Sequence, residues 1–133
     1  MEARGYHRIE LGDLQVTTLF DGSTPLPLDK LLTRAAPGEV EQRLADKGLQ
    51  APVETAINTY LIDTGERCVL IDAGAGTNFG PECGKLVENL TAAGYNPEQV
   101  DAVLLTHIHP DHTGGLVKEG RLCFETPIFL LAK

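Results

Sequence analysis

The amino-acid sequence predicts an α/β fold in a single small domain over residues 1–133. Short apolar segments of strand length alternate with a helical pattern, which is typical of a sheet covered by helices. The helical pattern lies at residues 81–93, where apolar residues recur at i, i+3, i+4 and i+7. A hydrophobic content of 42% is ordinary for one folded domain of this length.

The N-terminal part of the chain is expected to form a hairpin and two helices. The hairpin covers residues 7–20 and turns at a Gly-Asp pair. Its core candidates are Ile9, Leu11, Leu14, Val16 and Leu19. A short helix is expected at 28–32. A longer one is expected at 37–47, because a proline begins that segment and a glycine follows it. The longer helix has few apolar side chains, so we expect it on the surface or in a lid over a site.

The remaining expected elements are strands at 56–63, 68–72, 102–105, 121–124 and 127–131 and the helix at 81–93. The strands at 56–63 and 68–72 are close enough in sequence to pair as a hairpin. The run at 102–105 is wholly apolar, as expected for a buried strand. A cluster of polar side chains begins directly after it.

That cluster is the most informative segment of the chain. Residues 106–115 read Thr-His-Ile-His-Pro-Asp-His-Thr-Gly-Gly and contain three of the 4 histidines. Imidazole and carboxylate groups are ligands that zinc and similar divalent metals prefer. A rigid strand end can hold such ligands in a fixed geometry. The alternative is a polar loop with incidental histidines, which the agreement of ligand type, order and strand context disfavours.

The spacing of these side chains predicts two metal positions. In extended backbone, side chains two residues apart point the same way, so His107 and His109 can bind one metal. Pro110 ends the extended segment. The turn then directs Asp111 and His112 toward a second metal, about 3.5–4 Å from the first, as in binuclear hydrolytic sites.

The pattern His107-x-His109-x-Asp111-His112 resembles the metal-binding signature of the metallo-β-lactamase superfamily. Three other segments are similar to that family, at 58–65, 69–74 and 101–106. Residues 12–22 resemble the opening of the branch that includes methyl parathion hydrolase and related lactonases. The resemblance implies an αββα sandwich and a metal-dependent hydrolase. It also implies that this chain is the N-terminal portion of that fold, truncated at the C-terminus.

The resemblance further implies metal ligands that this chain lacks. Family members carry, further along the chain, a histidine for the first metal, an aspartate that bridges both metals and a histidine for the second. No histidine follows His112, and Glu119 and Glu125 are the carboxylates after Asp111. The chain thus supplies two ligands per metal, whereas a catalytic zinc usually has three protein ligands. Either the second half is missing, or another chain supplies it, or the site is no longer catalytic.

The expected cofactor is one or two Zn²⁺ ions, with manganese, iron and cobalt left open because imidazole suits several metals. A histidine at 109, where di-iron relatives carry a carboxylate, favours zinc. Asp111 is expected to bind a metal and, as the catalytic residue, to orient the nucleophile. Asp72 has two interpretations: it orients a metal ligand by a hydrogen bond, which the resemblance favours, or it is a turn carboxylate.

Other polar residues receive structural interpretations. Asp21, in an Asp-Gly pair, is expected to be a turn residue without a chemical role. His7 is expected to be a solvated strand residue, with an extra metal ligand as the alternative. The cysteines are Cys68, Cys83 and Cys123. They are odd in number and form no CxxC motif, so we expect reduced core residues in a reducing compartment.

The net charge and the apolar segments limit which partners we expect. A net charge of −8, from 11 basic and 19 acidic residues, argues against a nucleic-acid partner. The sequence shows no leader-like or membrane-spanning apolar segment, so we expect a cytoplasmic protein with no membrane partner. An apolar strand at 128–131 lies close to Lys133 and predicts either a homo-oligomer or a missing C-terminal half.

Two functional hypotheses follow. In the first, the chain is a hydrolase, or the ligand-bearing half of one, in which a metal-bound hydroxide attacks a small-molecule ester, lactone or phosphotriester. In the second, it is a non-catalytic half-domain that binds metal weakly or not at all and acts through self-association. The histidine cluster favours the first hypothesis, and the missing downstream ligands favour the second.

Overall fold

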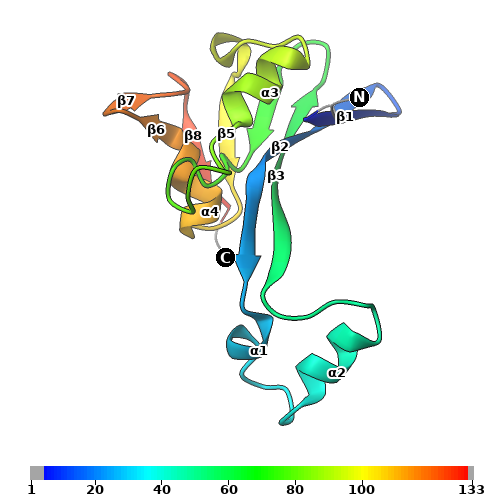
Figure 1. Ribbon diagram of the computed structural model, residues 1–133. Coiled ribbons are helices and arrows are strands. Elements are labelled where there is room, and N and C mark those ends of the chain that lie inside the picture. The colour runs from blue at the N-terminus through cyan, green and yellow to red at the C-terminus, as the bar shows by residue number, and fades with distance from the viewer. Residues whose placement is uncertain (1–4, 132–133) are drawn as a thin grey trace.

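The computed structural model describes residues 5–131 and contains a six-stranded sheet in the order β1-β2-β3-β4-β5-β8 (Figure 1). Its strands are β1 (Tyr6–Leu11), β2 (Leu14–Leu26), β3 (Val53–Asp63), β4 (Cys68–Ile71), β5 (Ala102–Leu105) and β8 (Ile128–Leu130). The first four strands pair antiparallel, whereas β4, β5 and β8 are parallel. The α/β fold class is therefore confirmed.

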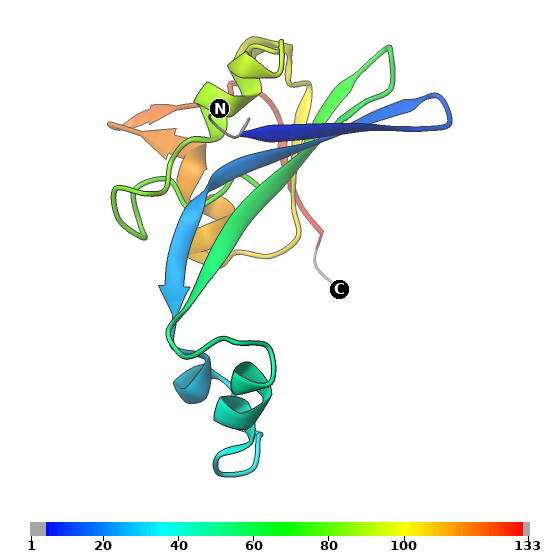
Figure 2. The same ribbon diagram turned by 45° about the vertical axis from the view of Figure 1, so that its right-hand side comes forward.

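The helices are α1 (Leu28–Leu31), α2 (Glu39–Ala45), α3 (Leu86–Ala92) and α4 (Pro110–Thr113), with 3-10 turns η1 (Pro97–Gln99) and η2 (Gly114–Leu116). The long strands β2 and β3 run past the rest of the sheet and carry α1 and α2 at their far end (Figure 2). Both helices expected before residue 50 are confirmed. No helix between residues 5 and 131 is long and apolar enough to cross a membrane.

The core lies between α3 and one face of the sheet. Leu86 and Leu90 of α3 pack against buried side chains of four strands. Those strand residues are Leu19, Leu61, Leu70 and Val103. The opposite sheet face is open among the described residues: the exposed fraction of Tyr60 is 44% and that of Phe129 is 53%. This chain alone thus buries one face of its sheet and leaves an apolar face accessible.

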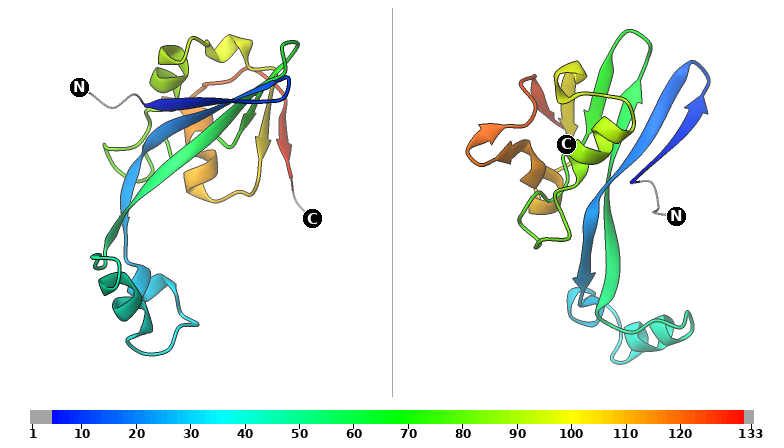
Figure 3. Two further views of the ribbon diagram at one scale, coloured as in Figure 1. Left: turned by 90° about the vertical axis from the view of Figure 1, so that its right-hand side faces the viewer. Right: turned by 45° about the horizontal axis from the view of Figure 1, so that its top comes forward.

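Several expectations about the core were wrong. Of the hairpin's core candidates, only Leu19 is buried, and Ile9, Leu11 and Leu14 are exposed at 50%, 64% and 36%. The β1–β2 turn extends beyond the end of α3 (Figure 3), so nothing among residues 5–131 covers the tip.

The strand expected at 121–124 is β7 (Arg121–Leu122), which pairs with an unexpected strand β6 (Val117–Lys118) in a separate two-stranded sheet.

Asp21 explains why the main helix begins later than expected. The side chain is fully buried within β2, at the irregularity in register between Phe20 and Gly22, so it is not a turn residue. Its carboxylate accepts hydrogen bonds from the backbone N–H groups of Ala75 (2.8 Å), Gly84 (3.3 Å) and Leu86 (3.1 Å). Because these donors include the first residue of α3, the helix starts at Leu86 rather than at residue 81.

Replacing this carboxylate by an amide tests its role. In Asp21→Asn, the new N–H₂ group faces backbone donors, so at least one buried N–H loses its acceptor. We expect a loss of about 1–3 kcal/mol in the free energy of unfolding, measured by urea denaturation followed by circular dichroism. The matched control is Asp13→Asn in the exposed β1–β2 turn, for which we expect no measurable change. Equal midpoints for the two variants would contradict the role of Asp21.

Candidate metal centre

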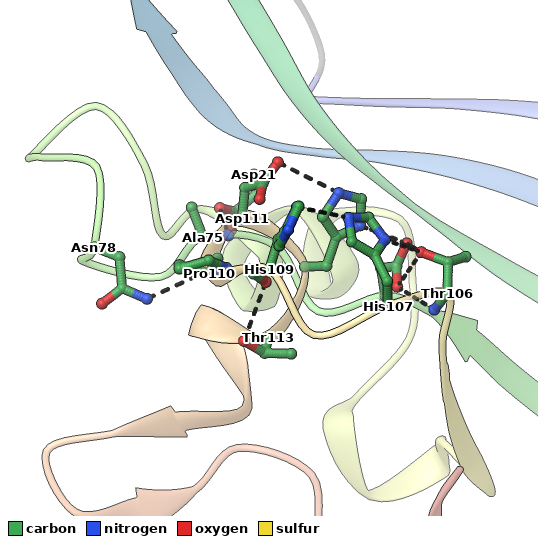
Figure 4. A network of polar contacts seen from close by, with 11 residues as sticks. Asp21, Ala75, Asn78, Thr106, His107, His109, Pro110, Asp111 and Thr113 are labelled. Atoms are coloured by element: carbon green, nitrogen blue, oxygen red, sulfur yellow. Dashed lines mark hydrogen bonds and ion pairs between the residues drawn. The ribbon is translucent and has the colours of Figure 1, made fainter. Parts of the chain in front are cut away.

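The candidate ligands lie where β5 ends. This strand is held between the parallel neighbours β4 and β8, and it delivers the chain to residue 106. Pro110 occupies the first position of α4, which suits a residue with no N–H to donate. The single turn of α4 carries Asp111 back beside His107 and His109 (Figure 4), and it brings the ring of His112 next to that of His107. The expected loop at 111–112 is thus a short helix.

The donor atoms of these four side chains form two close pairs. Nε2 of His107 lies 3.1 Å from Nδ1 of His109. Nε2 of His112 lies 3.3 Å from Oδ2 of Asp111. Two ligands of one tetrahedral zinc, each about 2.0–2.1 Å from the metal, are separated by about 3.3 Å. The two pairs therefore have the separation that two zinc ligands require.

The pairs adjoin each other at the same end of the sheet. The ring centroids of His107 and His112 are 4.0 Å apart, and those of His107 and His109 are 4.6 Å apart. His107 and His109 are exposed, while Asp111 and His112 are half-buried. The cluster is thus accessible to solvent on this chain, and it joins both pairs predicted from the sequence.

Asp72 is a buried carboxylate beneath the cluster, with an exposed fraction of 7%. It follows β4 directly and has φ of 60°, a left-handed conformation that aspartate adopts more readily than most residues. Its Oδ2 lies 2.8 Å from Nδ1 of His112. Its Oδ1 accepts the backbone N–H of Thr106 at 2.8 Å. This position is the one expected of a group that orients His112, and its effect on a metal stays a prediction.

Sequence reasoning assigned no role to Thr106. Its hydroxyl lies 2.8 Å from Oδ2 of Asp72 and 3.0 Å from Nδ1 of His107. The hydroxyl therefore connects the buried carboxylate to the first histidine of the motif. Its place directly before His107, at the end of a buried strand, is the only sequence signal that could have found it.

Close backbone packing fixes the segment after the ligands. The N–H of Ala73 donates to the carbonyl oxygen of His112 at 2.8 Å. A methyl group on Gly114 would overlap the carbonyl of Ala75, and one on Gly115 would overlap the carbonyl of Ala73. Glycines at these two positions let the ligand segment lie directly against the chain that follows β4.

The donor set fits a metal, but each pair is incomplete on its own. Among residues 5–131, no three His, Cys, Asp or Glu side chains form a group that could hold a metal ion. This agrees with two ligands in each pair, because a third protein ligand is usual for catalytic zinc. Glu119 and Glu125 are exposed and do not complete either pair within the described chain. His7 lies in β1, opposite Thr18.

The cysteines do not add metal ligands. All three are free, and Cys83 is buried. Burial raises the pKa of each thiol above its usual value, and for Cys68 and Cys83 nearby carboxylates raise it further. The thiolate is the form that binds metal, so these residues remain protonated structural side chains at neutral pH.

The family model described as the metallo-beta-lactamase superfamily matches residues 52–119, just over half of the chain. The chain belongs to the metallo-beta-lactamase superfamily. The matched region contains β3, β4, α3, β5 and the whole histidine cluster. A curated relative, the atrochrysone carboxyl ACP thioesterase of Aspergillus fumigatus, is 48% identical over 59 residues, which are 44% of this chain and 13% of that protein.

Solved structures are similar over nearly all of the chain. The hydrolase AbOPH of the beta lactamase superfamily has a TM-score of 0.88 and 37% identity, with 96% of this chain and 45% of that one covered. AidC, a dizinc quorum-quenching lactonase in complex with the product N-hexanoyl-L-homoserine, has a TM-score of 0.85 and 31% identity, with 93% and 44% covered. This chain therefore spans less than half of these solved structures, and a smaller part of the thioesterase, and it has a partial metallo-beta-lactamase fold.

A substitution at Gly115 tests the close approach beside the cluster. In Gly115→Ala, the added methyl group must displace the segment that holds His112, so we expect a loss of about 1–3 kcal/mol in the free energy of unfolding. The control is Gly12→Ala, where no atom lies within 4 Å of the new methyl group and only the cost of a positive φ applies. Thermal unfolding by circular dichroism compares the two. A higher melting temperature for Gly115→Ala than for Gly12→Ala would exclude the proposed crowding.

Proposed function

We propose that this chain carries the ligand-bearing half of a metal-dependent hydrolase that acts on small-molecule esters, lactones or phosphotriesters. The observation that carries the proposal is the pairing of His107 with His109 and of Asp111 with His112 at the end of β5. A second line of support is the similarity to AidC, whose name describes a dizinc lactonase. We place the protein in the cytoplasm, without a nucleic-acid or membrane partner.

In this proposal His107 and His109 hold one zinc ion, and Asp111 and His112 hold a second. Bound metals of this kind lower the pKa of water toward neutrality and polarise the bond to be cleaved. Asp72 holds His112 in one orientation through its 2.8 Å contact with Nδ1. Asp111 is the proposed catalytic residue, because a carboxylate at the edge of the cluster can accept a hydrogen bond from the attacking nucleophile. Manganese, iron and cobalt remain alternatives to zinc.

A hollow of about 570 Å³ lies beside the cluster and supports a substrate with an apolar group. His109, Asp111 and His112 line one side of it. Its other walls include apolar side chains from β2, α1, β3 and the loop after β4: Leu26, Leu31, Ile57, Tyr60 and Phe79. An apolar wall next to metal-binding groups is typical of small-molecule sites. We propose that this wall holds the acyl or leaving group of the substrate.

A different function is supported by the exposed apolar surface. Strand β8 forms one edge of the sheet, and Ile128, Phe129 and Leu130 have exposed fractions of 40%, 53% and 50%. Unpaired apolar edges recruit other chains. In this second candidate, the chain is a non-catalytic half-domain that pairs with a second copy. The same surface would receive a C-terminal half if one is present.

The first proposal is tested by hydrolysis in the presence of zinc. We expect the Zn²⁺-loaded chain, in an assembly that completes both ligand pairs, to hydrolyse p-nitrophenyl butyrate, a γ-lactone or an aryl phosphotriester. Because His109→Ala removes half of one metal pair, we expect its rate to fall at least 100-fold, measured as initial rates by absorbance. The matched control is His7→Ala in β1, which should retain the rate of the unmodified chain. Equal hydrolysis by all three proteins, or by none of them, would count against the proposal.

The second candidate is tested by assembly state. A chain that pairs through β8 should give a dimer at micromolar concentration in native mass spectrometry. Phe129→Lys should then shift the equilibrium toward monomer, because a charge on an edge strand opposes pairing. Ile9→Lys, at another exposed apolar position, is the control and should leave the dimer unchanged. A monomeric unmodified chain across the whole concentration range would exclude this candidate.

A further inference from the structure

The hydrogen bonds beneath the cluster determine which ring nitrogen of two histidines carries a proton. Asp72 contacts three groups: it accepts from the N–H and the hydroxyl of Thr106, and it lies next to Nδ1 of His112. Because both oxygens of Asp72 already accept hydrogen bonds from Thr106, this carboxylate acts as an acceptor. Nδ1 of His112 must therefore carry the hydrogen in the 2.8 Å contact, which leaves the lone pair on Nε2.

The same reasoning reaches His107 through Thr106. A hydroxyl has one hydrogen, and that of Thr106 is donated to Oδ2 of Asp72 at 2.8 Å. The oxygen of Thr106 can then only accept in its 3.0 Å contact with Nδ1 of His107. His107 must therefore also carry its hydrogen on Nδ1 and its lone pair on Nε2.

We propose that Thr106 is a positioning residue, which extends the control of Asp72 from His112 to His107. One carboxylate then sets the tautomer of a histidine in each of the two candidate metal pairs. Both Nε2 lone pairs face the donor atoms of the neighbouring ligands, at 3.1 Å for His109 and 3.3 Å for Asp111. The consequence for metal binding rests on the proposed function, whereas the tautomer assignment stands without it.

The tautomers are measured directly by NMR. Long-range ¹H–¹⁵N correlation spectra of the ¹⁵N-histidine-labelled, metal-free chain at pH 8 distinguish Nδ1–H from Nε2–H imidazoles. We expect the Nδ1–H form for both His107 and His112. In Thr106→Val, His107 should shift toward the Nε2–H form that free histidine favours, while His112 keeps Nδ1–H through Asp72. Thr106→Ser should restore the original spectrum, because it keeps the hydroxyl.

The control is Thr91→Val on the exposed surface of α3, where the hydroxyl donates only to the carbonyl of Val87. Its spectrum should match the unmodified chain. An Nε2–H form for His107 in the unmodified chain, or an unchanged His107 in a folded Thr106→Val, would overturn the assignment. If Thr106→Val does not fold, the unmodified chain and Thr106→Ser still decide it.

A second readout connects the tautomers to metal. Titration with Co²⁺, followed by its visible absorption, should show about 10- to 100-fold weaker binding in Thr106→Val, as is usual when a group that orients a ligand is lost. Thr106→Ser should bind close to normally. Equal affinity in both variants would show that Thr106 does not position a ligand. If the unmodified chain binds no Co²⁺, the proposed function fails while the NMR result still decides the tautomers.

Discussion

The end of the sheet that carries the candidate ligands depends on the carboxylate of Asp72. It lies 7% exposed between the end of β4 and the end of β5, and it is satisfied by one backbone N–H, one hydroxyl and one imidazole. A buried carboxylate without such partners would cost several kcal/mol. The positions of Thr106 and His112 are therefore coupled to the fold of the sheet. Movement of either residue would leave the buried carboxylate without one of its hydrogen-bond partners.

The candidate site supplies only part of the ligands that each metal would need, and the chain has only part of the metallo-beta-lactamase fold. Each pair supplies two donors at a spacing suited to one metal, and no third donor joins either pair among residues 5–131. The open apolar face of the sheet lies on the same molecule that lacks these donors, with Tyr60 and Phe129 about half exposed. A further layer packed on that face could both cover the apolar side chains and supply the missing ligands. This is the physical reason to consider the site and the surface together.

Much of the fold could be predicted from local sequence patterns. The wholly apolar run at 102–105 predicted β5 with correct bounds, and the Pro and Gly around 37–47 predicted α2. Patterns of apolar residues do not show what covers them, so Ile9 and Leu11 were wrongly expected in the core, whereas they are exposed on the β1–β2 hairpin. The start of α3 was also wrong, since a carboxylate from Asp21, 65 residues earlier in the chain, supplies the acceptor for Leu86. A local sequence pattern does not reveal such a contact between distant residues.

The cluster of candidate ligands could be found because chemistry concentrates it within six residues; of the groups around it, Asp72 was singled out through the family resemblance, whereas the roles of Asp21 and Thr106 were not found. Asp21 and Asp72 are both buried carboxylates at irregular backbone positions, one at a break in strand register and the other at φ of 60°. A periodic pattern gives no signal at either place. Each was expected, at least as one interpretation, to be a turn residue, because Asp is common in turns. Their shared property is that each accepts hydrogen bonds from segments distant in sequence. The histidine motif therefore predicts metal-binding chemistry, while the buried carboxylate of Asp72, 40 residues earlier in the chain, makes the contact with Nδ1 of His112 that the motif does not contain.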